Sequence, residues 1–489
     1  RSLVAVVVGV IGAGTMGAGI AQLAMGAGAE TFLVDPVEGA VERGEAGVRK
    51  GLERWAAKGR EVDPALLHTA RELGALRDCD IVIEAAPERL ELKHELFTTL
   101  SREVVSEDCV LASNTSSIPI TAIARVAERP ERVVGMHFFN PAPVMKLVEV
   151  IAGLESSEAA LARTRELGEA MGKRVIDCRD GPGFLVNRCN RPFGLEALKL
   201  LQDGISDVPA IDRIARAAGF RMGPFELQDL VGIDTGFEVS KSFAELGFGE
   251  PRWRPSPLSA QMVAAGRFGR KTGRGWYEYT DGERHRPDDP PPPSADPIAA
   301  LIVGDTPLAQ ALRENEGTVP SFSVETQGTD FRVVIDCDGT YDGDLPVARL
   351  LDRAPLAGRS GCGFFALPPL GAVELVDGPG ADLARQFFES LGKPVIEIGD
   401  CVGGVIGRMV CQVINESAFA VQEGVGSTED VDAGMQLGMN HPRGPFEWLE
   451  TVGAPQVLRV LDGLRDFTGE ERYRAAPWLR LRVAHLTHQ

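Results

Sequence analysis

The sequence lacks three features that would each assign it to a special class of protein. It has no C-x-x-C motif among its eight cysteines, no apolar run long enough to cross a membrane, and no excess of basic residues. The longest early apolar run, residues 3–11, is far shorter than the roughly 20 residues of a transmembrane helix and leads into a glycine-rich loop, which argues against a signal peptide. Unpaired cysteines in apolar runs are typical of a reducing compartment, so we predict a cytoplasmic protein without a metal site.

The charge balance narrows the possible partners. Lys and Arg number 51 against 70 Asp and Glu, a net charge of -19, which repels polyanions. We therefore predict no nucleic-acid partner and no membrane surface, and an anionic ligand needs a local basic or dipolar site. The 489 residues, 44% of them hydrophobic, exceed what one core usually serves and indicate two to four domains.

The chain changes character along its length. Its first 180 residues alternate β-rich runs with helical patterns, which is typical of a parallel sheet covered by helices. From about Asn187 helical patterns take over, and a proline cluster follows that is stiff and extended. The β-rich runs are residues 4–11, 31–35, 80–85, 109–114 and 132–139; the predicted domains are 1–182 (α/β), 183–282 (helical), 283–297 (linker), 298–399 (α/β) and 400–489 (helical).

A glycine motif follows the first β-rich run. Gly12, Gly14 and Gly17 have the G-x-G-x-x-G spacing, and Asp35 ends the next run. The first glycine allows a tight turn, the second lets the backbone reach a diphosphate, and the third lets helix and strand pack closely. A glycine-rich turn is the alternative, but the strand, helix and acid together predict a Rossmann-type dinucleotide site. Asp35 would accept hydrogen bonds from a ribose diol and repel a 2′-phosphate, so the motif favours NAD.

A histidine and a glutamate lie in a segment whose other residues are mostly apolar and are expected to be buried. His137 and Glu149 are 12 residues apart in "HFFNPAPVMKLVEV". If Pro141 and Pro143 break the chain between two strands, the two side chains face each other as a general base and its orienting acid. A buried histidine with a purely structural partner is the alternative.

Two polar motifs could complete this site. "SNTSS" follows a buried run at the carboxyl edge of the sheet, where Ser116 could hydrogen-bond a substrate oxygen, unless these residues cap a helix before Pro119. "GPGFLVNR" places Asn187 at the start of the helical region, where its amide could bridge histidine and substrate, or simply end a helix.

These motifs together resemble the 3-hydroxyacyl-CoA dehydrogenase family. The resemblance rests on "GAGTMGAGIA", "SNTSS", "HFFNPAPVMKLVEV", "GPGFLVNR" and "MGPFEL", across about residues 4–280. It implies oxidation of a 3-hydroxyacyl-CoA by NAD, with His137 taking the hydroxyl proton, Glu149 stabilising the imidazolium, and Ser116 and Asn187 positioning the substrate. The implied cofactor-binding residues are Gly12, Gly14, Thr15, Met16, Gly17, Asp35, Glu88, Lys93 and Asn114; Glu88 and Lys93 could instead be exposed residues opening a helix.

A basic stripe is the candidate site for the coenzyme A tail. Lys50, Arg54 and Lys58 recur at four-residue intervals, which on a helix places them on one face. Such a stripe is usually a solvated face, but on so acidic a protein it is what a polyphosphate requires. In the family an adenine-contacting lysine aligns with Lys58, while Gly51 stands where a small polar residue is often found.

The second half contains a repeat of the first. Residues 180–204 align without gaps to 400–424, an offset of 220, and no second glycine motif precedes the copy. At "GFFALPPLGAVELV" we expect Gly363 in the place of His137, and Gly407 in the place of Asn187. The predicted fold is thus an α/β Rossmann-type NAD-binding domain, an all-α domain, and a degenerate shortened duplicate of both.

The copy, lacking base and cofactor loop, is predicted to be a scaffold. It could replace the dimer partner of single-copy relatives, with residues 427–448 packing on residues 207–236. Assembly into a higher homo-oligomer is also compatible with the sequence. A non-catalytic NAD-binding structural protein and a dehydrogenase of another 3-hydroxy acid are the competing functions. A multifunctional enzyme would need a hydratase domain that no segment supplies, and both short and dicarboxylic acyl groups are compatible with the sequence.

Overall fold

The computed structural model describes residues 6–280, 285, 287, 289–314 and 331–486. The chain forms two compact units, Arg1–Arg188 with Glu423–Met439, and Cys189–Gln422 with Asn440–Gln489. Residues 4 and 5 of the first predicted β-rich run and residues 283, 284, 286 and 288 of the predicted linker lie outside the described residues. The five predicted domain boundaries stay a prediction.

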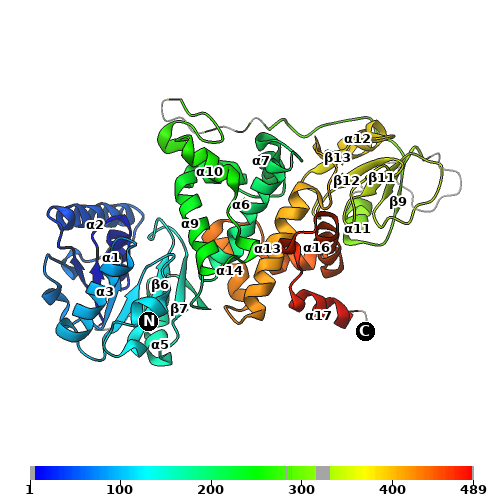
Figure 1. Cartoon of the computed structure of the whole chain (residues 1–489). Helices are drawn as coiled ribbons and strands as arrows, with labels where there is room; N and C mark the ends of the chain where they lie inside the picture. Colours follow the sequence, from blue (N-terminus) through cyan, green and yellow to red (C-terminus); the bar gives the residue numbers. More distant parts are fainter. Residues whose placement is uncertain (1–5, 281–284, 286, 288, 315–330, 487–489) are drawn as a thin grey trace. The chain divides into compact units, whose positions relative to one another are not determined.

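The first unit is built on an eight-stranded sheet of order β3-β2-β1-β4-β5-β6-β7-β8 (Figure 1). All five predicted β-rich runs form strands, but the sheet is not wholly parallel, because β6 and β7 pair antiparallel. The edge strands β3 and β8 were not predicted, because each has exposed or charged residues at half or more of its positions. The strands are β1 (Val7–Ile11), β2 (Glu30–Val34), β3 (Leu67–Ala70), β4 (Ile81–Glu84), β5 (Val110–Ser113), β6 (Val133–Phe138), β7 (Leu147–Ala152) and β8 (Arg174–Arg179).

Helices of the first unit bury their small apolar faces on this sheet. In α1 every residue from Gly17 to Met25 is buried, and Ile20, Leu23 and Ala24 belong to one core with the strands. Ser157 caps α5 by accepting a hydrogen bond from the backbone of Ala160. The helices are α1 (Thr15–Gly26), α2 (Ala40–Ala56), α3 (Leu90–Thr99), α4 (Ile120–Ala124), α5 (Glu158–Ala170), the start of α6 (Val186–Gln202) and α14 (Thr428–Met439).

Helix α14 comes from the second half of the chain but belongs to the first unit. The backbone N–H of Arg179 donates to the carbonyl of Val425 over 2.9 Å. A Cβ on Gly434 would lie 2.6 Å from the side chain of Val186, so the small residue lets the helix approach closely. The prediction that residues 427–448 pack as a whole on residues 207–236 is therefore wrong for α14, which packs on β7 and β8.

The second unit combines helices with a six-stranded sheet of order β14-β13-β12-β11-β10-β9 (Figure 1, green to red). Within it, His441 contacts Phe220 edge-on at a centroid distance of 4.9 Å, so this part of the predicted packing is confirmed. Its elements are α6 beyond Arg188, α7 (Val208–Ala217), α8 (Pro224–Val231), α9 (Ile233–Leu246), α10 (Pro257–Ala264), β9 (Ala300–Val303), α11 (Pro307–Glu314), β10 (Val333–Asp336), β11 (Val347–Leu350), β12 (Cys362–Phe365), β13 (Val373–Val376), α12 (Ala381–Ser390), β14 (Val395–Glu397), α13 (Gly404–Gln422), α15 (Pro445–Val452), α16 (Ala454–Thr468) and α17 (Pro477–Leu486).

The backbone of the second unit mirrors a contact of the first. The N–H of Gly399 donates to the carbonyl of Ile205 over 2.7 Å, and 220 residues separate this pair from Arg179 and Val425 (179 to 399, 205 to 425). The segment before α7 thus meets the segment after β14 as the segment before α14 meets the end of β8.

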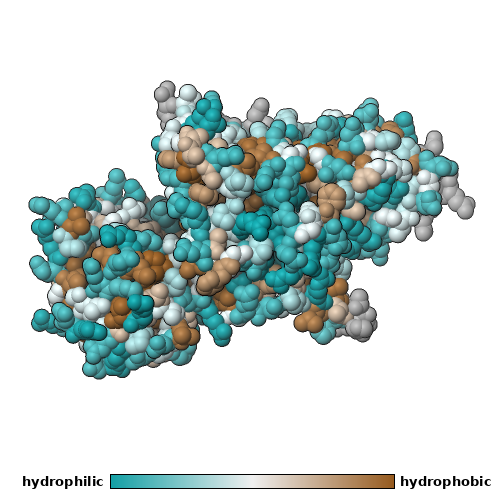
Figure 2. All heavy atoms as spheres, in the orientation of Figure 1, coloured by the Kyte–Doolittle hydropathy of each residue, from teal (hydrophilic) through white to brown (hydrophobic). Residues whose placement is uncertain are grey.

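The surface and the cysteines agree with the composition. In Figure 2 hydrophobic residues on the drawn face are scattered among hydrophilic ones. Among the described residues, no helix is long and apolar enough to span a bilayer. All eight cysteines are buried and unbridged, as their apolar surroundings in the sequence indicate.

Candidate active site

The glycine loop has the geometry that its spacing predicts. Gly12 has a φ of +97°, and a Cβ on Gly17 would lie 1.7 Å from the carbonyl oxygen of Gly12. No atom lies within 4 Å of where a Cβ on Gly14 would stand, so the backbone is open there. Thr15 and Met16 form the first turn of α1, whose N–H groups face this open loop. The first and third glycines therefore serve the fold, while the second leaves space for a diphosphate.

Asp35 follows β2 and reaches the glycine loop. Its Oδ2 accepts a hydrogen bond from Ala13 N over 2.8 Å, and its Oδ1 accepts one from Val37 N over 3.0 Å. The carboxylate is fixed at the carboxyl edge of the sheet and contacts the turn itself, because Ala13 lies between Gly12 and Gly14. This is the place where a ribose diol bonded to the diphosphate would lie.

A buried ion pair that the sequence analysis missed lies beside the loop. Lys93 Nζ is 2.6 Å from Glu84 Oε1, and both side chains are 1% exposed. Ser113 Oγ donates to the other Glu84 oxygen over 2.6 Å. The alternative that Lys93 is an exposed residue opening a helix is wrong. The signal available in the sequence was Glu84 itself, an acid that ends a run of buried strand residues.

The "SNTSS" segment wraps around Glu88. The Glu88 Oε1 atom accepts hydrogen bonds from Thr115 Oγ1 at 2.6 Å, from Ser117 Oγ at 2.9 Å, and from the backbone N–H groups of Ser116 and Ser117. Glu88 is exposed, as the alternative interpretation expected for it. Partial burial opposes the charge of its carboxyl, but the hydrogen bonds from Thr115 and Ser117 and the ammonium of Lys93 outweigh this and lower its pKa.

The side chains of the "SNTSS" segment do not cap a helix. Helix α4 has no side-chain cap, and its first N–H groups donate to the carboxylate of Asp180 instead. The capping interpretation is therefore wrong, and Ser116 is exposed at the strand edge. Asn114 Oδ1 accepts from the backbone N–H of Phe138 over 2.8 Å, which ties the end of β5 to β6.

His137 and Glu149 lie directly opposite each other on β6 and β7. His137 Nδ1 is 2.6 Å from Glu149 Oε2, with the histidine 6% and the glutamate 0% exposed. The other carboxylate oxygen accepts the backbone N–H groups of Leu185 and Val186 over 3.2 and 3.0 Å. The cis peptide bond before Pro141 lies in the connection between the two strands. The two side chains thus meet as the spacing predicts.

The imidazole is held in place by aromatic neighbours. The rings of Phe139 and Phe184 lie 4.7 and 5.8 Å from that of His137. Its Nε2 makes no hydrogen bond to any part of the chain that the structure describes, so this nitrogen can exchange a proton with a ligand. Asn187 directly follows Val186 in the first turn of α6 and is half-buried. The dyad and Asn187 are therefore linked through the start of one helix.

The basic stripe forms only in part. Lys50 and Arg54 lie on α2 and are exposed, but the helix ends at Ala56, so Lys58 follows it in a turn. None of the three basic residues has an ion pair within the described residues. No residue larger than glycine fits at position 51, because a Cβ there would lie 2.0 Å from Gln22 Oε1 of α1.

The second sheet has a buried acid like that of this arrangement, but no histidine opposite it. Glu374 on β13 accepts the backbone N–H groups of Val405 and Ile406, the latter over 3.0 Å, as Glu149 accepts those of Leu185 and Val186. The residue opposite Glu374 is Phe365, not Gly363. The expectation that Gly363 takes the place of His137 is therefore wrong.

The phenylalanine fills the space that a ligand would need. A Cβ on Gly407 would lie 2.3 Å from the ring of Phe365, so only glycine fits at this position. Burial raises the pKa of Glu374 to about 7, against the hydrogen bonds from Val405 and Ile406. Elsewhere among the described residues, no group of three or more His, Cys, Asp or Glu could hold a metal ion.

Two protein-family models match the chain. Residues 7–181 match the model described as 3-hydroxyacyl-CoA dehydrogenase, NAD binding domain. Residues 183–279 and residues 403–488 match the model described as 3-hydroxyacyl-CoA dehydrogenase, C-terminal domain. The helical region thus matches one model at two places.

Known proteins resemble the chain over its whole length or over half of it. The 3-hydroxyadipyl-CoA dehydrogenase of Escherichia coli (strain K12) is 36% identical over 490 residues, which cover 97% of each chain. The 3-hydroxybutyryl-CoA dehydrogenase of Mycobacterium tuberculosis (strain CDC 1551 / Oshkosh) is 43% identical over 281 residues, covering 56% of this chain and 98% of that protein. A crystal structure of 3-hydroxybutyryl-CoA dehydrogenase from Escherichia coli K12 substr. MG1655 covers 100% of both chains with a TM-score of 0.84 and 34% identity.

Proposed function

Because this chain belongs to the 3-hydroxyacyl-CoA dehydrogenase family, whose members use NAD, we propose that it interconverts (S)-3-hydroxyacyl-CoA and 3-oxoacyl-CoA with a dyad of His137 and Glu149. The observation that carries the proposal is the 2.6 Å contact between His137 Nδ1 and Glu149 Oε2, with Nε2 left available. A general base needs both a free nitrogen and a partner that fixes its ring.

In the oxidative direction, Nε2 of His137 takes the proton of the C3 hydroxyl. When bound, NAD would supply the acceptor for the hydride of C3, and the C3–O bond would become a carbonyl. The imidazolium that forms is stabilised by the carboxylate of Glu149, which the N–H groups of Leu185 and Val186 hold in position. In the reverse direction the same imidazolium returns its proton to the carbonyl oxygen.

The residues of the glycine loop fit NAD. Gly14 leaves open backbone beside the N-terminus of α1, and the Asp35 carboxylate disfavours a 2′-phosphate. Glu88 and Lys93 support the nicotinamide end of the proposed site, where the buried pair with Glu84 holds the strand edge rigid. Asn114 acts by tying β5 to β6 and so positions His137 one residue before Phe138.

Ser116 and Asn187 are proposed to hydrogen-bond the substrate oxygens. Support comes from the exposed side chain of Ser116 at the sheet edge and from the position of Asn187 next to Val186, which anchors Glu149. For the coenzyme A tail we propose Lys58, Arg54 and Lys50, which have no competing ion pair among the described residues. The acyl group is proposed only as a class, because one relative is named for a hydroxyadipyl and another for a hydroxybutyryl substrate.

The proposal is tested by following NADH oxidation at 340 nm with acetoacetyl-CoA and, as a control, with free acetoacetate. We expect turnover of the thioester only, and its loss in His137→Gln. Undiminished turnover in that variant would refute the role of the dyad. Equal turnover of both substrates would instead favour a dehydrogenase of another 3-hydroxy acid.

We further propose that residues 298–399 are a degenerate α/β duplicate and that residues 400–489 are a second helical copy, with the other boundaries at residues 182, 282 and 297. The hydrogen bonds of Glu374 and Glu149 support a common origin, and the ring of Phe365 in the place of a histidine supports a copy without catalytic activity. No glycine motif follows β9, where Gly304 leads directly to Asp305 and Thr306.

The copy is proposed to act as an internal partner. A Cβ on Gly438 of α14 would lie 3.3 Å from the ring of Phe139, whose centroid is 4.7 Å from that of His137. A helix from the second half of the chain thereby packs behind the aromatic ring beside His137. In a single-copy protein a separate subunit would have to supply such a helix.

A further inference from the structure

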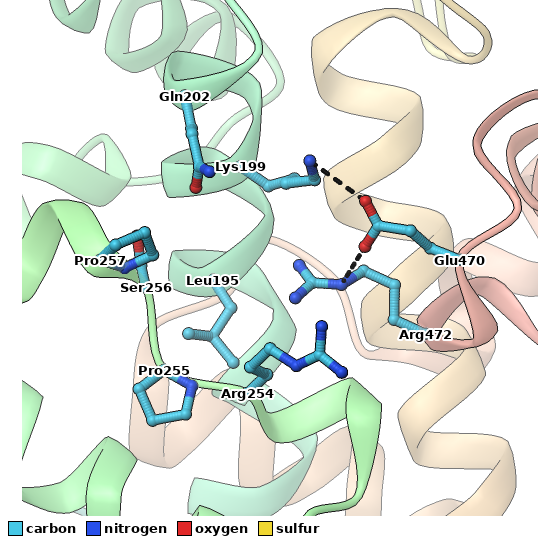
Figure 3. Close-up of a pocket in the computed structure, with 9 residues that line it drawn as sticks. All are labelled: Leu195, Lys199, Gln202, Arg254, Pro255, Ser256, Pro257, Glu470 and Arg472. Atoms are coloured by element: carbon cyan, nitrogen blue, oxygen red, sulfur yellow. Dashed lines mark ion pairs between the residues drawn. The ribbon is translucent and has the colours of Figure 1, made fainter.

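The second unit contains a cavity of about 460 Å³ that the proposed catalysis does not use. Its walls come from α6, from the segment before α10, and from the segment before α17 (Figure 3). Cavities of about 150 Å³ hold a benzene molecule, so this one has room for a substituted ring with water. The lining residues are Leu195, Lys199, Gln202, Arg254, Pro255, Ser256, Pro257, Glu470 and Arg472.

The internal repeat shows what fills the equivalent place in the other copy. Adding 220 to Lys199 gives Phe419 of α13, whose ring is buried. The guanidinium carbons of Arg252 and Arg474 lie 3.7 and 5.0 Å from the centroid of that ring. An aromatic ring in contact with two guanidinium groups is therefore the occupant in the closed copy.

Hydrogen bonds of polar side chains also fill the equivalent place in that copy. Asn415 donates to the carbonyl of Arg474 over 2.9 Å and accepts the N–H of Ala476 over 2.8 Å. Gln422 accepts the N–H of Trp478 over 2.8 Å. These bonds hold α13 against the segment that leads into α17.

The open copy lacks these contacts because its sequence differs. Leu195 replaces Asn415 (195 to 415), and Lys199 replaces the phenylalanine. No bond joins the side chains of Leu195, Lys199 or Gln202 to residues 254–258 in the described part of the chain. Lys199 turns instead toward Glu470, 3.1 Å away, as Figure 3 shows, and the space of the ring stays empty.

The two arginines equivalent to the stacking pair remain at the walls. Arg472 corresponds to Arg252 (252 to 472), and Arg254 corresponds to Arg474 (254 to 474). Only the Nε of Arg472 is paired, with Glu470 at 3.0 Å, and Arg254 has no ion pair within the residues that the structure describes. Two guanidinium groups with free N–H donors thus line one cavity.

The charges of the walls select an anion. Lys199, Arg254 and Arg472 carry three positive charges, and Glu470 carries one negative charge. Asp203, 2.7 Å from the ammonium of Lys199, offsets one more. One positive charge remains, on a protein whose net charge is -19.

We propose that this cavity binds an aromatic monocarboxylate, with the ring stacked on the guanidinium groups of Arg254 and Arg472 as Phe419 is stacked in the other copy. The carboxylate neutralises the remaining positive charge and accepts hydrogen bonds from the free N–H groups. Gln202 and Ser256 offer further polar contacts at the rim. The inference does not depend on the dehydrogenase reaction.

The test is isothermal titration of the full-length protein, saturated with NADH, with benzoate and with cyclohexanecarboxylate. The two acids share charge and size, but only benzoate has an aromatic face. We expect benzoate to bind about 5-fold more tightly than cyclohexanecarboxylate. This ratio corresponds to a cation–π interaction energy in the lower part of the usual range. Equal binding of the two acids, or tighter binding of AMP than of benzoate, would overturn the assignment.

Variants locate the site. Arg254→Gln should weaken the binding of benzoate about 10-fold, because a charge-assisted hydrogen bond is lost. The matched variant Arg474→Gln in the closed copy should change the affinity for benzoate less than about 2-fold. Lys199→Phe should abolish binding, because it supplies the missing ring. Arg254 is exposed, so its variant is expected to fold even if Lys199→Phe does not. Unchanged binding in Arg254→Gln, or equal losses in both arginine variants, would place benzoate elsewhere and refute the proposal.

Discussion

The two sheets offer a controlled test of the proposed dyad, because each contains a buried glutamate that accepts two backbone N–H groups at equivalent places (185 to 405, 186 to 406). Glu149→Gln removes the negative charge opposite His137, and Glu374→Gln removes the equivalent group opposite Phe365. Both carboxylates are 0% exposed, and each accepts two N–H groups at the start of a helix. Only the first has a histidine whose positive charge it can stabilise.

The magnitude follows from the charges that meet in the reaction. A carboxylate and an imidazolium about 4 Å apart attract by about 4 kcal/mol at an effective dielectric constant of about 20. Loss of that attraction when the base is protonated corresponds to about a 10³-fold fall in kcat. A glutamine also cannot face the N–H groups of Leu185 and Val186 and the Nδ1–H of His137 with acceptor atoms alone. The orientation of the imidazole is therefore lost together with the charge.

The assay is the steady-state reduction of NAD by (S)-3-hydroxybutyryl-CoA, the direction in which the imidazolium forms. In Glu149→Gln we expect kcat to fall by about 10³ with KM changed less than about 3-fold, because the charge acts on the protonated base and not on substrate binding. Glu374→Gln should keep kcat within about 2-fold of the parent enzyme. If the first variant retains most of its activity, or if the second loses as much as the first, the reasoning is wrong.

Four further predictions use the same structure. The pKa of Glu374 is raised from 4.5 to about 7, so its contribution to the stability of the fold is complete below pH 4.5 and is lost as pH rises through 7. The shift corresponds to about 3 kcal/mol of unfolding free energy. The difference between the melting temperatures at pH 5 and pH 8 should therefore be smaller in Glu374→Gln than in the parent. Lys93→Met leaves Glu84 buried without its cation and should destabilise the first unit by about 3 kcal/mol or more, measured by chemical denaturation, with Lys50→Met as the exposed control. NADH should bind at least about 10-fold more tightly than NADPH in titrations, and Asp35→Ala should narrow that ratio. Removal of residues 298–489 takes α14 from β7 and β8 and should yield dimers or aggregates in size-exclusion chromatography; a monomer of full activity would contradict the internal-partner proposal.

Features set by local geometry could be predicted from the sequence. The roles of Gly12 and Gly17 follow from the turn and the helix contact that the spacing requires, and both are found. His137 and Glu149 could be paired because prolines mark the connection between their strands. The buried pair of Lys93 and Glu84 could not be predicted, because a lysine near the start of a helix usually faces solvent and its partner lies on another element.

Features that depend on register or on long-range packing escaped the sequence analysis. An offset of 226 in this segment (137 to 363), which differs from the 220 of the helical region, suggested Gly363 as the counterpart of His137. The connection between β12 and β13 is shorter than that between β6 and β7, so Phe365 and not Gly363 lies opposite the glutamate. The repeat indicated that two helical copies exist. It could not show that α14 packs on the first sheet, because equivalent sequences carry the same apolar face in either arrangement.

The copy also separates two roles that one glutamate has in the first sheet. Glu149 anchors the start of α6 and orients His137, while Glu374 only anchors the start of α13. A buried carboxylate that receives two backbone N–H groups satisfies donors that the first turn of a helix leaves unpaired, so its removal would be costly whether or not a histidine stands opposite. The histidine has no such structural obligation, and Phe365 can replace it with apolar packing. An acid without a base in the second sheet is therefore what the fold explains, because the anchoring role of the glutamate does not depend on the proposed catalytic role of a histidine.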